Sequence, residues 1–496
     1  MATPMSFGRR IAEIADTRPE EAAVVLLDGA EPVEALTWRE LSNRSDQAAR
    51  AFARRGVRKG SFIGISFPNS LEHYVAALGA WKVGACAMPV RPDVPERERA
   101  ALLAVRTPDL MVGEWPAACP TLGPVDFAAA LDAEPVEPLP DVISCPGRAT
   151  TSGGTTGLPK LIVDHRPWAL VPGEYSASKV ARIGFGYRQR QLVVGALYHT
   201  VGFFFSHRGL FEEHTLYVMR RFDPGAALAA IERHDIHFTV AVPTMLRRMM
   251  RHPAVHTTDL SSIQAVLHTG GSCPPEVKRF WIDRLGPQKV FESYGSTESA
   301  GSATCRGDEW LARPGTVGRG SPDCEIRILD EEGRPCPPGV VGEIYFATPG
   351  PPPFHYLGEH RPRTAPDGSV SIGDLGKLDE DGYLYIIDRR TDMIVMGGVN
   401  VYASEVEAAL LEHPDVADAV VIGIADPEWG RRVHALLVAD GRRPTDADIL
   451  RHCRERLAAP KVPKSFEWLP ALPRDDVGKI RRSELVAARE ASERSA

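Results

Sequence analysis

The stretch Thr150–Lys160, TTSGGTTGLPK, carries hydroxyls, glycines and one lysine at a higher density than the rest of the 496-residue chain. Glycines tolerate positive φ, so that successive backbone N–H groups can line one concavity and bind an anion. Hydroxyls add donors, and lysine adds a compact positive charge. A flexible Ser/Gly/Thr linker is the alternative for such a composition. The stretch predicts a loop that binds phosphate, with the candidate residues Thr151, Ser152, Gly153, Gly154, Thr155, Thr156, Gly157 and Lys160.

Segments further along the chain favour phosphate binding over a linker. The stretch lacks the spacing of the Walker-type loop, which ends in Gly-Lys-Ser/Thr. Four later segments, Glu292–Glu298 (ESYGSTE), Gly373-Asp374, Asp388-Arg389 and Gly478-Lys479, follow it in a fixed order. Together the five motifs resemble those of the adenylate-forming superfamily of acyl-CoA synthetases, peptide-synthetase adenylation domains and luciferases. The resemblance covers about the whole chain, from Leu36 to Leu485.

Length and composition indicate a globular protein with more than one core, since single cores rarely exceed about 300 residues. The 43% hydrophobic content includes no run of eighteen apolar residues, and the N-terminal region carries early charges, so we expect neither a membrane span nor a secretory signal, and a cytoplasmic protein. Eight cysteines without a CxxC pair argue against structural zinc and disulfides. A net charge of −7 without a basic cluster argues against nucleic acid as a partner.

Apolar patterning predicts an α/β fold, because strands and helices alternate through the first half of the chain. Helices are expected over residues 5–17, 38–55 and 70–82, and strands over residues 23–27, 61–67, 86–90, 191–197, 237–243 and 262–268. The aromatic run Phe203–Phe205 is expected on a strand. Thr37 and Glu40 form a capping-box pattern before the second helix.

The last third of the chain changes character. Short alternating runs at residues 324–329, 342–346 and 383–387 predict a small antiparallel barrel. An α+β pattern follows, with helices at 404–413 and 446–457 and strands at 419–424 and 434–438. We therefore expect a large N-terminal domain, residues 1–390, of two αβα-layered sheets plus a small β-barrel. A mobile α+β C-terminal domain, residues 392–496, would follow a hinge near Thr391.

The resemblance implies a two-step reaction that uses ATP, Mg²⁺ and coenzyme A. A carboxylate attacks the α-phosphate of ATP to give an acyl-adenylate, and a thiol then displaces AMP. Glu298 is similar to the magnesium carboxylate of the family, and Lys479 to the lysine that the mobile domain brings to the α-phosphate. The candidate catalytic residues are Lys479, Glu298 and Thr155, with Glu298 also the candidate metal ligand.

The nucleotide site is expected to combine an aromatic face with a close-packed backbone. Tyr294 offers a flat face for adenine, and Asp374 and Arg389 match the positions that contact the ribose and phosphate in the family. The remaining candidates for nucleotide binding are Gly270, Gly271, Ser272, Gly295, Ser296 and Thr297. Gly397 and Gly398 are the candidates for the CoA tunnel. The hinge position departs from the family pattern, because Thr391 stands where Asp or Lys is common.

The residues after Tyr198 and His199 include no carboxylate to pair with a substrate amine, so we expect an acid without an α-amine. The segments Tyr294–Glu298 and Asp388–Tyr402 look most like those of CoA ligases for bulky polycyclic acids of the bile-acid, steroid or diterpenoid type. The excess of arginine over lysine fits a GC-rich bacterial source. The resemblance to ligases of polycyclic acids implies a natural-product or steroid/terpenoid role, which the sequence does not separate from a catabolic one. The candidate substrate-binding residues are Tyr198, His199, Gly202, Phe204, His268 and Ser299.

Two other classes stay open at this point. One is an adenylating enzyme that loads a carrier-protein thiol, with Arg431-Arg432 and Arg481-Arg482 as a basic patch for an acidic partner. The other is an impaired protein that senses an acid or nucleotide, which the joint presence of the motif residues argues against. The sequence does not decide the oligomeric state and is compatible with a homodimer.

Overall fold

The computed structural model describes residues 3–115, 119–152, 160–358, 361–397, 399–475, 478 and 480–495, without the side chains of residues 152 and 493–495. These residues group into two compact units. The first comprises residues 3–152, 160–321 and 348–362, and the second comprises residues 322–347 and 363–495. The residues just before Thr391 belong to the same compact unit as the residues after it. The hinge and the domain boundary at Thr391 were predicted from an expected movement, and they stay predictions.

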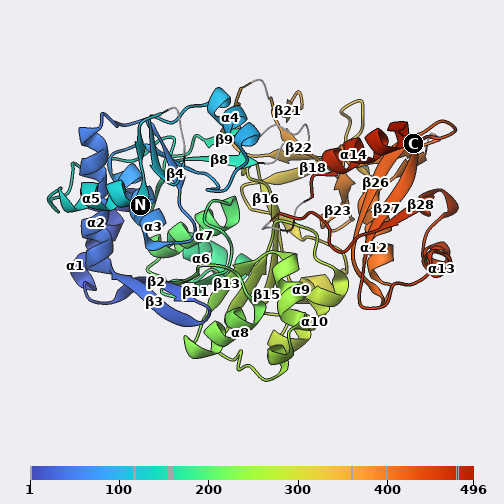
Figure 1. Ribbon diagram of the computed structural model, residues 1–496, viewed down its shortest axis with the longest axis horizontal. Helices are drawn as coiled ribbons and strands as arrows, with labels where there is room; N and C mark the ends of the chain where they lie inside the picture. The colour runs from blue at the N-terminus through green and yellow to red at the C-terminus, as the bar shows by residue number, and fades with distance from the viewer. Residues whose placement is uncertain are drawn as a thin grey trace. The chain divides into compact units, whose positions relative to one another are not determined.

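A nine-stranded sheet forms one half of the first unit (Figure 1). Six neighbouring strands are parallel, and antiparallel strands complete both edges. Parallel central strands are buried on both faces and are therefore almost continuously apolar, as the sequence predicts. In sheet order the strands are β17 (Arg319–Gly320), β16 (Ser302–Arg306), β15 (Val290–Gly295), β14 (Ala265–His268), β13 (Phe238–Ala241), β11 (Arg190–Val193), β12 (Thr215–Met219), β2 (Ala22–Asp28) and β3 (Glu31–Thr37).

A seven-stranded sheet forms the other half of the same unit. Its strands from β8 to β7 are parallel, and β9 and β20 add an antiparallel edge. The order is β20 (Phe354–Leu357), β9 (Lys160–Asp164), β8 (Arg148–Ser152), β5 (Cys86–Pro89), β4 (Phe62–Ser66), β6 (Leu110–Gly113) and β7 (Thr121–Leu122). A separate pair joins β1 (Met5–Ser6) to β10 (Ala169–Leu170).

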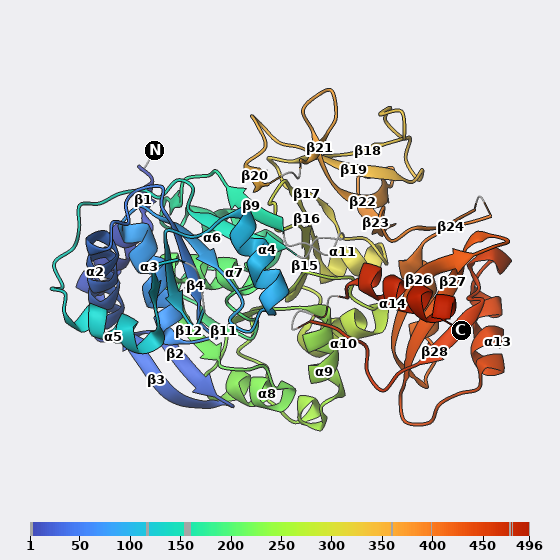
Figure 2. The ribbon, with the colours of Figure 1, turned by 45° about the horizontal axis from the view of Figure 1, so that its top comes forward.

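Helices of the first unit pack against both sheets. A large apolar cluster joins residues of α1, α2, α3 and α7 to strands of each sheet, and in it the Phe7 ring lies 5.0 Å from Trp81 and 4.9 Å from Phe211. Figure 2 shows α2, α3 and α5 side by side at one end of this unit. The helices are α1 (Phe7–Thr17), α2 (Trp38–Arg54), α3 (Leu71–Lys82), α4 (Glu96–Val105), α5 (Pro124–Asp132), α6 (Glu174–Ile183), α7 (Thr200–Phe211), α8 (Pro224–Arg233), α9 (Pro243–Arg251), α10 (Pro275–Leu285) and α11 (Gly307–Ala312).

The second unit contains an antiparallel sheet and an α+β part. In the sheet, β18 (Glu325–Leu329), β19 (Gly342–Ala347) and β22 (Val370–Leu378) are neighbours, and β21 (Arg363–Thr364) and β23 (Leu384–Arg389) both pair with β22. The α+β part has its own apolar core. It consists of β24 (Ile394–Met396), β25 (Val399–Val401), α12 (Ala403–Leu411), β26 (Val416–Asp426), β27 (Gly430–Ala439), α13 (Asp446–Arg456), β28 (Ser465–Trp468) and α14 (Arg482–Ser495).

The structure confirms the α/β class and most element positions. The predicted capping box is formed, since the Glu40 backbone N–H donates to Thr37 Oγ1 (3.2 Å) and the Thr37 N–H donates to Glu40 Oε2 (2.8 Å). The strand expected at Phe203–Phe205 is wrong, because these residues lie on helix α7. The strand β11 ends at Val193, and Phe203, His207 and Leu210 then recur at helical spacing on the buried face of α7.

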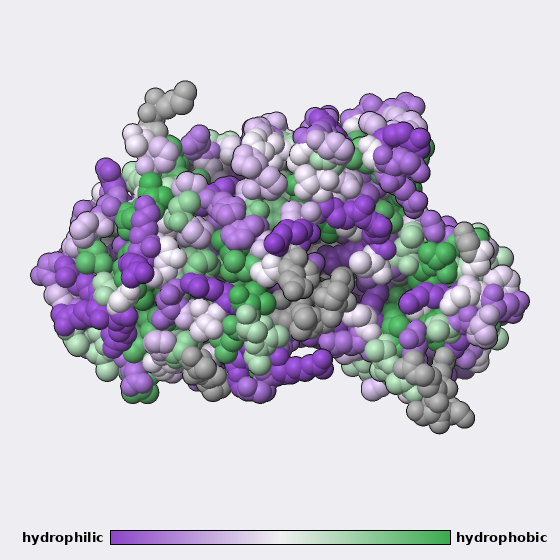
Figure 3. Space-filling model, turned by 90° about the horizontal axis from the view of Figure 1, so that it is seen from above, coloured by the Kyte–Doolittle hydropathy of each residue, from purple (hydrophilic) through white to green (hydrophobic). Residues whose placement is uncertain are grey.

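On the face seen in Figure 3, hydrophobic residues form separate patches among hydrophilic ones. Of the helices that the structure describes, none combines the length and the apolar character needed to cross a bilayer.

Candidate active site

Most of the predicted site residues of the first unit lie along one edge of the nine-stranded sheet. Parallel strands bring their carboxyl ends to the same edge, which is where open α/β sheets bind ligands. Tyr198 and His199 follow β11, Gly270–Ser272 follow β14, and Tyr294–Ser299 span the end of β15 and the turn after it. The alternation recognised in the sequence therefore gathers segments that are about 20 to 100 residues apart in the chain.

The glycine-rich stretch joins two paired strands of the seven-stranded sheet. Thr151 and Ser152 end β8, Lys160 begins β9, and Ser152 is the register partner of Lys160. Both ends of the stretch are thus held side by side by the antiparallel pairing. The predicted phosphate-binding residues Gly153, Gly154, Thr155, Thr156 and Gly157 lie outside the described residues.

Glu298 is held by a residue that the sequence analysis did not identify. The Tyr356 hydroxyl donates to Glu298 Oε1 at 2.7 Å, and Lys160 Nζ lies 5.4 Å from the centre of the Tyr356 ring. Burial and the neighbouring carboxylate both raise the pKa of Tyr356, so its hydroxyl keeps its proton. Among the described residues, Tyr356 is the hydrogen-bond donor to this carboxylate, which leaves the second oxygen able to ligate a cation.

Backbone and hydroxyl groups shape the turn that carries Glu298. Ser299 has a φ of 53°, in the left-handed region, and its N–H donates to the Ser296 carbonyl at 3.0 Å. The hydroxyls of Thr297 and Thr200 lie 3.4 Å apart, linking the turn to the start of α7. Ser299 Oγ accepts a bond of 3.2 Å from Arg148 Nη2. The turn is therefore fixed from two sides.

The segment after β14 has the close-packed backbone that was expected for an adenine site. Gly270 has a φ of 85°, which favours glycine, and a Cβ there would lie 3.4 Å from Val242. Ser272 and Gly271 are exposed at this edge. Tyr294 ends the adjacent strand β15. The predicted combination of an aromatic face and glycine backbone is therefore present on neighbouring strands.

Residues predicted to bind the acid surround the start of α7. The Tyr198 and His199 rings are 4.8 Å apart, and His199 is the residue before the helix. Phe203 is fully buried in the core, whereas Phe204 is partly exposed and lies between the Trp168 and Tyr175 rings at 6.2 and 6.4 Å. Burial therefore excludes Phe203 as a ligand contact, while Phe204, the predicted residue, and Phe205 are both partly exposed.

Glycine occupies position 202 for a structural reason that the sequence analysis did not identify. A Cβ at this position would lie 2.4 Å from the Ala196 carbonyl oxygen, so a side chain would push the first turn of α7 away from the segment after β11. Glycine is required there by the close approach of two backbones. The glycine at this position is therefore explained by backbone packing, independently of its predicted role in substrate binding.

His268 is buried at the end of β14 and lies 3.9 Å from Glu292, which pairs with Lys278. Burial lowers the pKa of His268 to about 4, so the imidazole is neutral near pH 7. The positive charge of Lys278 and the negative charge of Glu292 neutralise each other. This geometry favours a packing role beside the site over acid–base chemistry.

Asp374 and Arg389 come together in the second unit, as their predicted shared role requires. They are register partners on β22 and β23, with Arg389 Nε 3.5 Å from Asp374 Oδ1. Asp374 is buried and Arg389 is exposed. One carboxylate and one mobile guanidinium on neighbouring strands can contact the hydroxyls of a ribose and an adjacent phosphate.

Gly397 meets an aromatic side chain in the second unit. Its φ is 55°, its N–H donates to the Trp429 carbonyl at 2.9 Å, and a Cβ would lie 2.8 Å from the Trp429 ring. A side chain at this position would displace the indole. Gly398 and Lys479, also predicted for this part of the mechanism, lie outside the described residues.

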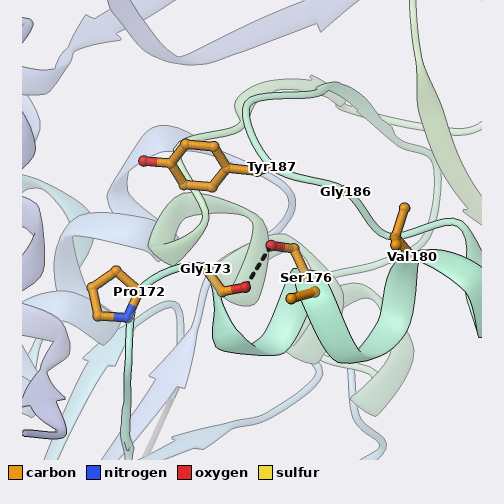
Figure 4. Close-up of a pocket in the computed structure, with 7 residues that line it drawn as sticks. Pro172, Gly173, Ser176, Val180, Gly186 and Tyr187 are labelled. Carbon is orange, nitrogen blue, oxygen red and sulfur yellow. Dashed lines mark hydrogen bonds between the residues drawn. The ribbon is translucent and has the colours of Figure 1, made fainter. Parts of the chain in front are cut away.

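A shallow pocket on α6 contains none of the predicted site residues (Figure 4). Its lining includes Pro172, Gly173, Ser176, Val180, Gly186 and Tyr187. The Ser176 hydroxyl donates to the Gly173 carbonyl at 3.1 Å and also lies 3.0 Å from Glu212 Oε2. The Ser176 hydroxyl therefore already bonds to other groups of the protein, and the pocket adds no group to the candidate site.

Comparison with known proteins agrees with this arrangement. The family "AMP-binding enzyme" matches residues 11–351, and "AMP-binding enzyme C-terminal domain" matches residues 405–479. A feruloyl-CoA synthase of Amycolatopsis sp is 32% identical, with 91% of this chain and 93% of the relative covered. A fatty acid–[acyl-carrier-protein] ligase of Streptomyces coeruleorubidus is 30% identical, with 91% of each chain covered.

Solved structures give the same result. The o-succinylbenzoate CoA synthetase of Bacillus subtilis, in complex with its acyl-adenylate intermediate, has a TM-score of 0.83 at 28% identity, with 98% of both chains covered. The same synthetase has also been solved with ATP and a magnesium ion. The chain therefore belongs to the AMP-binding enzyme family.

Proposed function

We propose that the protein is an AMP-forming acid–thiol ligase, which activates a carboxylic acid with ATP and transfers the acyl group to coenzyme A. The observation that carries the proposal is the grouping of Lys160, Tyr356 and Glu298 beside the two strands that hold the glycine-rich stretch. A cation and a fixed carboxylate at this place suit a magnesium–polyphosphate complex. Membership of the AMP-binding enzyme family supports it.

Adenylation needs charge neutralisation more than proton transfer, because a carboxylate is already a nucleophile at neutral pH. Residues 151–160 would hold the β- and γ-phosphates, and Glu298, oriented by Tyr356, would be the ligand of Mg²⁺. Bound Mg²⁺ would neutralise part of the phosphate charge. Tyr294 and Gly270–Ser272 orient the adenine, while Asp374 and Arg389 hold the ribose.

The second half-reaction depends on the C-terminal residues. Lys479 stabilises the charge on the α-phosphate during adenylation, and a movement about Thr391 then replaces it with the segment at Gly397 and Gly398, where the thiol of CoA enters. Gly397 packs against Trp429 and has no side chain that could cover its own backbone. This supports the role proposed for the segment.

The acid lacks an α-amine, since the segment Tyr198–Phe205 offers no carboxylate to pair with an ammonium group. The names of the relatives described above refer to feruloyl, fatty acyl and o-succinylbenzoyl groups. None of these names supports the predicted preference for polycyclic acids. We retain a bulky hydrophobic acid as the proposal, with polycyclic acids as one group to be tested.

The first experiment is acid-dependent exchange of labelled pyrophosphate into ATP, over fatty, aryl, amino, bile and diterpenoid acids, followed by addition of CoA. Exchange with an acid that lacks an amine, followed by a thioester, is the expected result. Exchange with amino acids alone would contradict the proposed substrate class. No exchange with any of these acids, nor with dicarboxylic acids added to the panel, would contradict the proposed activity.

A second experiment tests whether Lys479 acts only in the first half-reaction. Lys479→Ala should abolish adenylate formation but leave transfer from a preformed acyl-adenylate to CoA largely intact, because the lysine acts in the first step only. Lys59→Ala, which changes an exposed lysine of the first unit, is the control. Equal losses in both half-reactions would contradict the proposed movement.

A carrier-protein thiol is the second candidate acceptor, favoured by the similarity to a fatty acid–[acyl-carrier-protein] ligase. It predicts exchange without any CoA thioester, and acyl transfer when a phosphopantetheinylated carrier protein is added instead. A cytoplasmic location and a homodimer belong to the same proposal and are tested by fractionation and by light scattering.

A further inference from the structure

Two buried arginines converge next to the candidate acid site. Arg148 lies on β8 and is 1% exposed, and Arg208 lies on α7 and is 8% exposed. Their guanidinium carbons lie 5.3 and 5.4 Å from the centre of the Phe204 ring, and Arg148 also donates to Ser299. Phe204 and Ser299 were both predicted to contact the acid. The arginines therefore border that region.

The hydrogen-bonding capacity of this pair is incompletely used. Nε and Nη1 of both arginines are buried without an acceptor among the described residues. Arg148 shares Asp164 with Arg166, which already binds both oxygens of that carboxylate at 2.9 and 2.7 Å. Guanidinium groups that are buried in proteins normally have most of their N–H donors paired.

Positive charge exceeds negative charge around the pair. Arg148, Arg166 and Arg208 interact with the single carboxylate of Asp164, and the neighbouring Tyr175 stays neutral because burial raises its pKa to about 12. Glu212 lies one turn beyond Arg208, but its hydrogen bonds come from Ser176 and the Gly173 backbone, and the described residues include no ion pair between Glu212 and Arg208.

Aromatic rings compensate only part of this burial. The Arg208 guanidinium carbon lies 4.5 Å from the Trp168 ring centre and 5.5 Å from that of Phe7. Rings attract the positive charge but accept no conventional hydrogen bond from the N–H edge. A carboxylate supplies both negative charge and in-plane acceptors, and it binds guanidinium in a bidentate manner.

We propose that Arg148 and Arg208 bind a second carboxylate of the acid substrate, distant from the carboxylate that is activated. The substrate is then a dicarboxylic acid whose apolar middle part contacts Phe204. The inference rests on the proposed function and assigns a substrate class to the same site. It also explains why two guanidinium groups with unused buried N–H donors persist in a largely aromatic environment.

The test compares acids that differ by one carboxylate, using pyrophosphate exchange with the full-length protein. Suitable pairs are 2-succinylbenzoate with 4-oxo-4-phenylbutyrate, and adipate with hexanoate. The expected kcat/KM for the better dicarboxylate exceeds that for its partner by about 100-fold, as for a charge-assisted pair of hydrogen bonds. Equal or better exchange with the monocarboxylates would overturn the inference and leave the proposed function standing.

The variant Arg208→Met removes one guanidinium while keeping an unbranched side chain. The ratio of kcat/KM within each pair of acids should fall to about one, and the ligand-free protein should melt at the same or a higher temperature, because an unpaired buried charge is removed. Arg220→Met, at an exposed arginine paired with Glu34, is the control and should leave the ratio unchanged. A lower melting temperature together with an unchanged ratio would overturn the inference and make Arg208 a packing residue.

Discussion

The last turn of α7 separates two clusters of buried charge that differ in how fully they are paired. On one side, Glu213 accepts hydrogen bonds from Arg10 (2.6 Å), Arg18 (3.2 Å) and Arg188 (2.7 Å), and from the Tyr187 hydroxyl. On the other side, Arg148 and Arg208 keep buried N–H groups without acceptors. A carboxylate saturated by protein donors stabilises the fold, whereas open donors are available for a ligand.

Glu298, the carboxylate proposed to ligate magnesium, resembles the Arg148–Arg208 pair, because protein groups use only part of its hydrogen-bonding capacity. Glu298 receives one hydrogen bond from Tyr356, while Glu213 receives four from its neighbours. Glu213 is buried and Glu298 is half-buried, so exposure also differs between the two carboxylates. The number of protein donors already committed to each oxygen is the more informative property.

The largest expected effect is on Glu298. Glu298→Gln should lower the rate of pyrophosphate exchange by about 10²–10³-fold and raise the Mg²⁺ requirement, because a metal ligand with a full negative charge is lost. The melting temperature should change little. Glu72→Gln, on the exposed side of α3, is the matched control. A loss of stability without a loss of rate would show that Glu298 has a structural role and is not a metal ligand.

Glu213→Ala should produce the opposite result. Removing this carboxylate takes away the 2.6 Å ion pair of the buried Arg10 and leaves it with weaker partners, the Phe211 carbonyl and the Tyr187 hydroxyl at 3.2 Å and Glu13 at 3.9 Å, which should lower the free energy of unfolding by about 3 kcal/mol. Denaturant titration measures the change. The exposed Glu34, which pairs with Arg220 outside this cluster, provides the control Glu34→Ala, expected to cost less than about 1 kcal/mol. Similar costs for both variants would contradict the structural role of the Glu213 cluster.

Buried histidines should make the protein sensitive to mild acid. Burial lowers the pKa of His73 and His207 to about 3, whereas both should titrate near 6.5 when unfolded. Between these values the unfolded chain binds more protons, so this contribution to stability is complete above about pH 6.5 and declines as the pH falls toward 3. Denaturation midpoints at several pH values measure the slope, and His73→Phe should flatten it. An unchanged slope in that variant would contradict the assignment.

The smallest expected effect concerns the residue that orients Glu298. Tyr356→Phe removes one hydrogen bond, worth about 1 kcal/mol, and should raise the half-saturating Mg²⁺ concentration by about fivefold with a smaller change in kcat. Tyr345→Phe, in the antiparallel sheet of the second unit, is the control. An equal fall in kcat at saturating Mg²⁺ would show that Tyr356 has a role other than positioning the metal ligand.

The candidate site was predictable where a local pattern defines it. Tyr294 and Glu298 stand in one short motif, and Asp374 and Arg389 were paired by their order in the chain before β22 and β23 placed them side by side. Tyr356 was missed because its short strand β20 directly follows a Pro-rich stretch and shows no recognisable spacing in the sequence. Arg148 was missed because a single arginine before the glycine-rich stretch gives no signal until its burial is known.

Sequence alone was sufficient for the α/β class, most strands and helices, and the order of the motifs, since apolar periodicity and capping are local properties of the chain. Tertiary structure was needed for the assignment of Phe203–Phe205 to a helix, for the backbone contact that requires Gly202, and for the meeting of Arg148 with Arg208. These features depend on which atoms approach each other across distant segments. Unpaired buried donors, in particular, exist only once the chain has folded around them.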